Sequence, residues 1–322
     1  MKNFLIDVPV ALIFFNRPEV LAPVFECVRK ARPSKLFLIQ DGARKHKTTD
    51  AAKVQECRNI VKNIDWDCNV TQDYSDVNLG CGQRIFTGLK KAFMEVDRLV
   101  IVEDDIAFGE SFLPFCAEML ERYKDDQRIH LVSGMNHIGV YGICPNSYFF
   151  AKGGGAIWGW ATWKRCWDEI EWDLPPAEDK YIQKVFPHSF YDKREGTTFQ
   201  IRANHLRNLI KSGSAPTFWS FHNGYYAQLQ NRINIVPKFN LISNLGLTAE
   251  SAHGVNSIKK IPSALRCIFN AKIYEMPFPL KHPQFVLDDQ YYMSMQNNIM
   301  KPKGVYKLMR YAERLWIKLF VR

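Results

Sequence analysis

The sequence lacks several patterns that would assign a chain directly to a known class. Its 8 cysteines form no CxxC pair and do not alternate with histidine, which excludes a structural zinc module. No apolar run approaches the ~20 residues that a membrane-spanning helix needs. Residues 1–7 contain one lysine and no long apolar stretch, so we expect no secretion signal. These absences favour a cytoplasmic protein with reduced, mostly buried thiols, although the even cysteine count also permits disulfides.

Length and charge leave several classes of protein open. The chain has 322 residues, 47% of them hydrophobic, so it can bury a large core in one domain or in two that share an interface. Its 43 Lys and Arg exceed its 33 Asp and Glu and give a net charge of +10. Such a charge suits nucleic acid, an anionic membrane surface or phosphorylated substrates, and does not choose among them.

Short apolar runs alternate with segments of helical periodicity in the first part of the chain. The run at 8–15 is continuous and rich in β-formers, as a buried parallel strand should be. We expect further strands at 35–40, 68–72, 99–102 and 129–133, and helices at 19–30, 51–64, 83–96 and 111–123. This alternation predicts an α/β, Rossmann-like fold with a mostly parallel sheet flanked by helices.

The alternation ends near residue 140, and a tryptophan-dense stretch follows Gly153-Gly154-Gly155. Helices at 181–186 and 198–211 and a strand at 233–236 indicate a mixed second half. We therefore divide the chain into 1–140, 141–260 as the second half of the same domain, and a C-terminal extension, 261–322.

The last segment, 305–322, has the pattern of a basic amphipathic helix. Its apolar residues share one face, and its lysines and arginines lie towards the other. Such a helix, with an interfacial tryptophan at Trp316, suits the surface of an anionic membrane. The alternative is a terminal helix that packs on its own domain.

Three consecutive acids, Glu103-Asp104-Asp105, directly follow the strand expected at 99–102. Like charges at a strand end repel and lose hydration unless a positive charge lies nearby. A divalent cation would supply that charge, because Mg²⁺ and Mn²⁺ prefer carboxylate oxygens and often share nucleotide phosphates. A solvated acidic turn or a helix start is the alternative. Asn16 and Asp41 also fall at strand ends, where ligands of parallel sheets gather.

Residues 99–123 resemble the DxD-type segment of GT-A glycosyltransferases, in particular the EDD form of Golgi-type N-acetylglucosaminyltransferases and of bacterial family 2-like sugar transferases. Further motifs look like that group and occur in its order. They are VALIFFNRPEVL at 10–21, Gln40-Asp41-Gly42, Asn78-Leu79-Gly80 with Gly82, and the run from Trp158 to Trp163. Together they cover roughly residues 8–255, and their conjunction is more specific than any single motif.

The resemblance implies transfer of a sugar from a nucleotide diphosphate donor with Mn²⁺ or Mg²⁺. Residues 1–140 would bind the donor and 141–260 the acceptor. Asp105 would bind the metal, joined by His253 from Ser251-Ala252-His253-Gly254. The other donor-site residues would be Glu103 and Asp104 at the base and ribose, Asn16, Arg17 and Asp41 in the nucleoside pocket, Asn78, Gly80 and Arg84 near the sugar diphosphate, and Trp158 against a sugar ring.

The catalytic base is the part that does not match. Inverting enzymes of this type use a carboxylate near a tryptophan, and the corresponding stretch, 218–223, contains no Asp or Glu. His222 is our first candidate, because histidine titrates near neutrality. Asp168 and Glu171 in the tryptophan-rich stretch are the next candidates, and a protein without catalysis remains a further interpretation.

We thus expect a metal-dependent glycosyltransferase that acts on a glycan or lipid-linked acceptor in surface polysaccharide synthesis, and the resemblance implies inversion at the anomeric carbon. We expect it in the cytoplasm, with peripheral contact to the inner face of the membrane through 305–322. A nucleotidyltransferase is disfavoured because no GxGxR-like loop follows the first strand. A nucleic-acid-binding protein is the alternative from another class, but we expect no nucleic-acid partner, since the cations are dispersed except at the C-terminus and no nucleic-acid motif occurs. An inactive sugar- or nucleotide-binding protein stays open.

Overall fold

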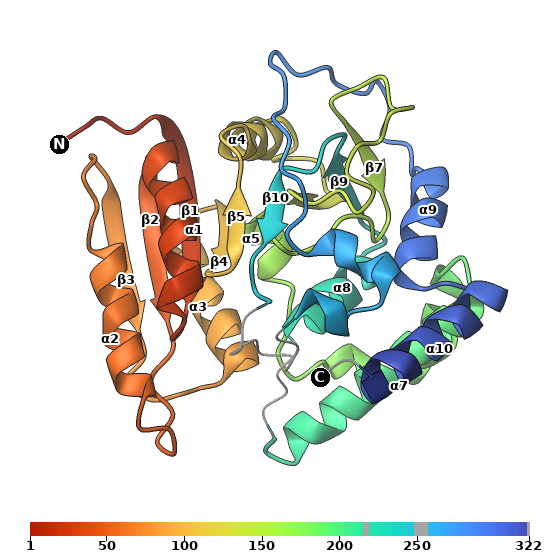
Figure 1. Ribbon diagram of the computed structural model, residues 1–322. Helices are drawn as coiled ribbons and strands as arrows, with labels where there is room; N and C mark the ends of the chain where they lie inside the picture. Colours follow the sequence, from red (N-terminus) through yellow and green to blue (C-terminus); the bar gives the residue numbers. More distant parts are fainter. Residues whose placement is uncertain (215–218, 248–256, 321–322) are drawn as a thin grey trace.

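A computed structural model describes residues 1–214, 219–247 and 257–320 (Figure 1). The strands are Ile6–Phe14 (β1), Pro33–Gln40 (β2), Asn69–Tyr74 (β3), Arg98–Glu103 (β4), Ile106–Phe108 (β5), Ile129–Ser133 (β6), Tyr148–Ala151 (β7), Trp160–Trp163 (β8), Ile233–Pro237 (β9) and Ile242–Asn244 (β10). The α-helices are Pro18–Ala31 (α1), Asp50–Val61 (α2), Cys81–Glu95 (α3), Phe112–Arg122 (α4), Lys164–Trp167 (α5), Lys180–Val185 (α6), Lys193–Lys211 (α7), Trp219–Leu229 (α8), Gln290–Met300 (α9) and Gly304–Phe320 (α10). Short 3-10 helices are Pro175–Glu178 (η1), Phe186–Ser189 (η2), Ile258–Lys260 (η3) and Ser263–Ile268 (η4).

Within these ranges the core of the protein is an 8-stranded sheet in the order β3-β2-β1-β4-β8-β6-β9-β7. Strands β3, β2, β1 and β4 are parallel, and so are β6 and β9. Strands β8 and β7 run antiparallel to their neighbours. The predicted α/β fold with a mostly parallel sheet is therefore confirmed.

Helices cover both faces of this sheet, because alternate residues of a strand point in opposite directions. Val10 and Leu12 of β1 belong to one hydrophobic cluster with residues of α1, α2 and α4, whereas Ala11 and Ile13 belong to a second cluster with residues of α3, α5, α7 and α8. Both faces of β1 are thus buried, which explains its continuous apolar sequence.

The tryptophan-rich stretch forms a strand that the sequence did not predict. Strand β8 lies between β4 and β6, so segments from both sides of residue 140 build one sheet. Trp160 is fully buried, and Trp163 Nε1 donates a hydrogen bond to the carbonyl oxygen of Leu120 at 2.9 Å. Both tryptophans are therefore core side chains.

The C-terminal part lies on the side of the molecule away from β3 (Figure 1). Helix α9 was not predicted, while α10 matches the helix expected from residue 305. Helix α7 begins at Lys193 rather than at 198, because Asp192 accepts a hydrogen bond from the Arg194 amide and caps it. In the described ranges, no helix is both long and apolar enough to cross a bilayer.

The cysteines are all free thiols. Of the 8, four are buried, which is fewer than the sequence had led us to expect: Cys57, Cys116, Cys144 and Cys166.

Candidate functional site

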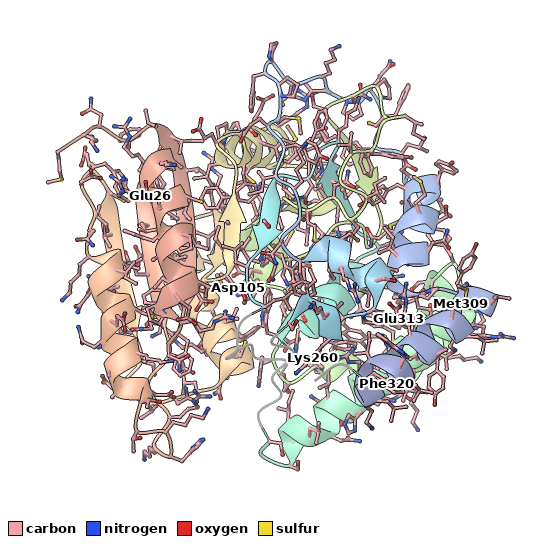
Figure 2. All side chains as sticks on the ribbon, viewed as in Figure 1. Glu26, Asp105, Lys260, Met309, Glu313 and Phe320 are labelled. Carbon is pink, nitrogen blue, oxygen red and sulfur yellow. The ribbon has the colours of Figure 1, made fainter. Side chains whose placement is uncertain are left out.

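The carboxyl ends of β1, β2, β3 and β4 meet at one edge of the sheet. Gln40 pairs with Phe14 on one side and with Tyr74 on the other, and Ile13 pairs with Glu103. The residues that follow these ends therefore leave from the same edge. They are Asn16 and Arg17 after β1, Asp41 and Gly42 after β2, and Asp104 and Asp105 after β4. Glu103, Asp104 and Asp105 are called the acid cluster below, and Asp105 lies near the centre of the molecule in Figure 2.

Arg17 lies between two members of the acid cluster. Its Nη2 donates to Oδ1 of Asp104 and, at 3.0 Å, to Oδ2 of Asp105. Asp104 also accepts a 3.3 Å hydrogen bond from the amide of Phe15. Burial alone would lower the pKa of Arg17, but the charges of the two carboxylates outweigh it and raise that pKa. Arg17 is therefore the internal counter-ion of this pair.

Glu103 has no comparable partner. Among the described residues its carboxylate enters no hydrogen bond and no ion pair. Burial, followed by the charges of Asp105 and Asp104, raises the pKa of Glu103 to about 8. Burial also raises the pKa of Asp104 to about 6, against the opposing charge of Arg17. One guanidinium thus leaves the acid cluster incompletely neutralised, and a further cation would favour its ionised form.

The oxygens of the acid cluster fit a hard divalent cation. Glu103 and Oδ1 of Asp105 have no donor in the described part of the chain, and Mg²⁺ and Mn²⁺ prefer such carboxylate oxygens. Across 1–214, 219–247 and 257–320, however, no group of three or more His, Cys, Asp or Glu could hold a metal ion. A cation would also need oxygens from phosphate or water, or a ligand from elsewhere in the chain. His253 lies outside the described residues.

The antiparallel pair β5 and β10 brings a distant segment to Asp105. The amide of Leu245 donates to the carbonyl oxygen of Asp105 at 2.7 Å, and the amide of Gly246 donates to Oδ1 of Asn244 at 2.7 Å. A Cβ atom at Gly246 would overlap Oδ2 of Asp105. Glycine therefore permits this close approach of backbone to carboxylate. No sequence pattern signals this contact, because it joins residues far apart in the chain.

Asp41 holds the loop that leads into α3. Its carboxylate accepts hydrogen bonds from the amides of Gly42, Leu79 and Gly80, each at 2.9 Å, and from Nδ2 of Asn78 at 3.0 Å. Gly80 caps α3 with a φ of +78°, a conformation that favours glycine. Asp41 thus positions Asn78, Gly80 and the first turn of α3 beside the strand ends.

Two other predicted donor-site residues also make contacts within the protein. Arg84 is buried, donates to the carbonyl oxygen of Gln40 at 3.1 Å and pairs with Asp73 at 2.7 Å. Asn16 donates to Oδ1 of Asp50 at 2.9 Å. No sequence pattern links Asn16 with Asp50, because only folding brings them together. Both contacts fix the strand-end loops in place.

His222 and Trp158 lie in packed surroundings. His222 is 1% exposed and stacks on Trp172, with 4.7 Å between ring centroids. Its Nε2 donates to the carbonyl oxygen of Trp172 at 2.8 Å. Trp158 is half-buried, and its ring centroid lies 5.5 Å from that of Phe269. The packing of His222 does not present it to an acceptor at the surface.

Asp168 lies at the edge of the sheet opposite the acid cluster. Because β8 runs antiparallel to β4, Trp163 at its end pairs with Arg98 at the start of β4. Asp168 follows one helical turn later and pairs with Lys164. The structure therefore does not bring Asp168 together with the acid cluster. Glu171 is an exposed residue in the connection between α5 and η1.

Two surface cavities lie away from these residues. One, of about 510 Å³, is at the opposite edge of the sheet and is lined in part by Asp7 and Lys35. The other, of about 780 Å³, is lined by residues of β7 and α9 and by Tyr141 and Phe285. Neither is lined by the acid cluster, which is marked as the candidate site by its charge and its place in the sheet.

The sequence matches no protein-family model and no curated protein. Among solved structures it is similar to S. aureus TarS, with a TM-score of 0.39 and 12% identity, over 96% of this chain and 79% of that one. It is also similar to a cytidylyltransferase from Leptospira borgpetersenii serovar Hardjo-bovis, with a TM-score of 0.31 and 12% identity, over 56% of this chain and 71% of that one. Likenesses this remote assign no activity to the chain.

Proposed function

We propose that this chain is a glycosyltransferase whose nucleotide diphosphate sugar donor binds at the acid cluster. The proposal is carried by the position of the three acids, which lie at the carboxyl end of the inner strand β4, at the edge where β1, β2 and β3 also end. Nucleotides bind parallel α/β sheets at this edge. The resemblance of residues 99–123 and of the motifs around them to GT-A glycosyltransferases supports the same assignment.

Cationic and polar groups at the same edge suit a diphosphate. Arg17 presents a planar set of donors that can bind paired phosphate oxygens. The first turn of α3, fixed there by Asp41, adds the positive end of a helix dipole. In this proposal Asn16, Asn78 and Gly80 line the pocket. Arg84 stabilises it indirectly, by donating a hydrogen bond to the carbonyl oxygen of Gln40 at the end of β2.

Mn²⁺ or Mg²⁺ is the cofactor that we propose, held by Asp105, with Glu103 beside it. Such an ion offsets the charge that develops on a departing nucleotide diphosphate. Arg17 is the chain's own group for the same task, since it already balances Asp104 and Asp105. His253 stays a proposed second ligand.

A purified chain and a panel of nucleotides test the proposal. Thermal stability should rise with one nucleotide diphosphate only when Mn²⁺ or Mg²⁺ is present, because a ligand that binds the folded state stabilises it. Asp105→Asn should lose this joint effect. Two outcomes would contradict the proposed donor site. One is stabilisation by the nucleotide without metal, and the other is no stabilisation by any nucleotide, with or without metal.

A donor-binding protein without catalysis is the second candidate. It is favoured by the placement of the predicted bases, since His222 is buried against Trp172 and Asp168 lies at the far edge of the sheet. Turnover separates the two candidates, because a transferase releases nucleotide diphosphate and a binder does not. For the transferase we propose a glycan or lipid-linked acceptor and no nucleic-acid partner.

A further inference from the structure

Helix α10 presents its apolar side chains to solvent. On a soluble domain the apolar stripe of an amphipathic helix normally faces the core. Here Leu308, Trp316 and Leu319 are 69%, 56% and 73% exposed. Met309 and Phe320 are also exposed, and both are labelled along α10 in Figure 2. Within the described part of the chain, the apolar face of α10 therefore has no partner.

Polar contacts hold α10 on the body of the protein in this orientation. Its buried residues are Arg310 and Ile317. Arg310 donates to the carbonyl oxygen of Met300 at 3.3 Å, and Oε1 of Glu313 accepts from the amide of Ser263 at 2.7 Å. These three inward positions, spaced by three, four and seven residues, form a narrow strip along one side of the helix. Helix α10 is thus held on the body of the protein by these contacts while its apolar face points to solvent.

The outward side chains form two separate surfaces. The exposed apolar residues follow one arc of the helix and are called the apolar arc: Val305, Leu308, Met309, Ala312, Leu315, Trp316, Leu319 and Phe320. Lys307, Arg314 and Lys318 are exposed on another side and are called the basic edge. A docked helix with an apolar arc and a basic edge has two features that a lipid surface recognises.

The charge around α10 indicates which kind of partner surface would bind the apolar arc. Glu313 is the one acid within α10, and it is already bound to the Ser263 amide. The neighbouring helix η3, which contacts α10, adds Lys259 and Lys260. A second copy of the chain docked through α10 would add the same positive charge at this surface, which disfavours self-association. An anionic lipid surface instead complements them.

We propose that α10 docks this protein on an anionic lipid surface, with the apolar arc in the interfacial region and the basic edge attracted by the headgroups. A helix that lies in the plane of the membrane need not span it, and no described helix is both long and apolar enough to do so. The inference does not depend on the reaction at the acid cluster. If the acceptor is lipid-linked, the same contact would bring the donor site to it.

Vesicle sedimentation of the full chain tests the proposal. Vesicles of phosphatidylcholine alone are compared with vesicles that contain about one third phosphatidylglycerol. We expect the wild type to bind the anionic vesicles and the triple variant Leu308→Gln, Leu315→Gln, Leu319→Gln to partition at least ~10-fold less. Because these leucines are exposed, the fold should be unchanged, as circular dichroism can check.

Matched controls separate the apolar arc from general surface effects. Met94→Gln on α3 and Ile201→Gln on α7 also remove exposed apolar side chains, which are 72% and 63% exposed, and should leave vesicle binding unchanged. A second variant, Lys307→Gln, Arg314→Gln, Lys318→Gln, should lose the preference for anionic vesicles while keeping the apolar arc.

Two results would overturn the proposal. The first is vesicle binding by the triple leucine variant at the wild-type level. The second is a wild-type protein that does not bind vesicles but forms dimers in sedimentation velocity, with the dimers lost in the triple leucine variant. The apolar arc would then bind a second copy of the chain. Stabilisation by nucleotide and metal is measured in parallel, so a failure here is distinct from a failure of the proposed function.

Discussion

The Nη2 atom of Arg17 lies 3.0 Å from Oδ2 of Asp105 and so joins the ends of β1 and β4. The side chains of Arg17 and Asp105 are 15% and 16% exposed, which shields their charges from much of the solvent. Because Arg17 also pairs with Asp104, one cation faces three acids, and among the described residues Glu103 has no ion-pair partner of its own. A strand end with this residual negative charge is the physical basis of the proposed cation and donor site.

Replacing Arg17 by alanine should destabilise the metal-free protein. Removing one partner of a buried ion pair costs about 3–5 kcal/mol, and we expect the low end because solvent reaches this pair. Mn²⁺ should restore part of the loss by replacing the missing charge. Urea unfolding in EDTA and in Mn²⁺ measures both effects.

Arg98→Ala is the control for that variant. Arg98 pairs with Glu121, whose side chain is 57% exposed, so the loss should stay below ~1 kcal/mol and should not respond to Mn²⁺. Equal losses in the two variants would contradict a counter-ion role for Arg17.

Stability of the metal-free protein should fall as the pH rises. Burial and the neighbouring acids raise the pKa of Glu103 from 4.5 to about 8, so between these values the folded protein keeps a proton that the unfolded chain has released. Stability decreases with pH wherever the folded state binds more protons. Glu103→Gln, which cannot ionise, should reduce this decrease. Urea unfolding in EDTA near pH ~5 and near pH ~8 measures this change for the wild type and for Glu103→Gln. An equal change in the free energy of unfolding with pH in the two proteins would contradict the prediction.

Asp41→Ala should remove the hydrogen bonds that position the start of α3 and so destabilise the protein. It removes the acceptor of the Gly42 amide, which is buried, and of the Leu79 and Gly80 amides, which are half-buried. Buried donors without partners cost about 1–3 kcal/mol each, and half-buried donors cost the low end of that range. We expect a loss of about 3 kcal/mol in the free energy of unfolding and weaker nucleotide binding. Asp67→Ala, which removes an exposed carboxylate near β3, should change neither quantity. A loss confined to nucleotide binding would instead assign Asp41 to direct ligand contact.

Gly246→Ala tests the contact between β10 and the acid cluster. The added methyl group would meet Oδ2 of Asp105 and displace that carboxylate. We expect the joint stabilisation by nucleotide diphosphate and Mn²⁺ to drop, even where the fold is retained. Gly142→Ala is the matched control, because a Cβ there has no atom within 4 Å. An unchanged response in Gly246→Ala would remove Asp105 from the metal site.

Much of the sheet could be predicted from the sequence because its strands are buried on both faces. Strands β1, β2 and β4 appear as uninterrupted apolar runs, and each is followed by polar residues at the edge where ligands bind. Strand β8 could not be predicted from such a pattern. Its WATW sequence is a four-residue strand without a distinctive period, and its antiparallel place between β4 and β6 depends on contacts distant in the chain.

Side-chain environments at the site could not be read in the same way. The EDD run predicted a charged strand end, but the bond between Arg17 and Asp105 joins residues far apart in sequence. Nothing in the pattern around His222 distinguishes a surface base from a ring stacked on Trp172. Likewise, helical periodicity identified the apolar face of α10, while its outward direction depends on the tertiary contacts of Arg310 and Ile317.

The most direct measurement is turnover of a panel of nucleotide diphosphate sugars by the purified chain, with and without Mn²⁺. We expect one donor to be consumed only when the metal is present, and Asp105→Asn to lower kcat by at least ~100-fold. Asp97→Asn, at a side chain that is 88% exposed beside the start of β4, should keep wild-type turnover. Sugar transfer that proceeds unchanged in Asp105→Asn or without any divalent metal would contradict the proposed role of the acid cluster.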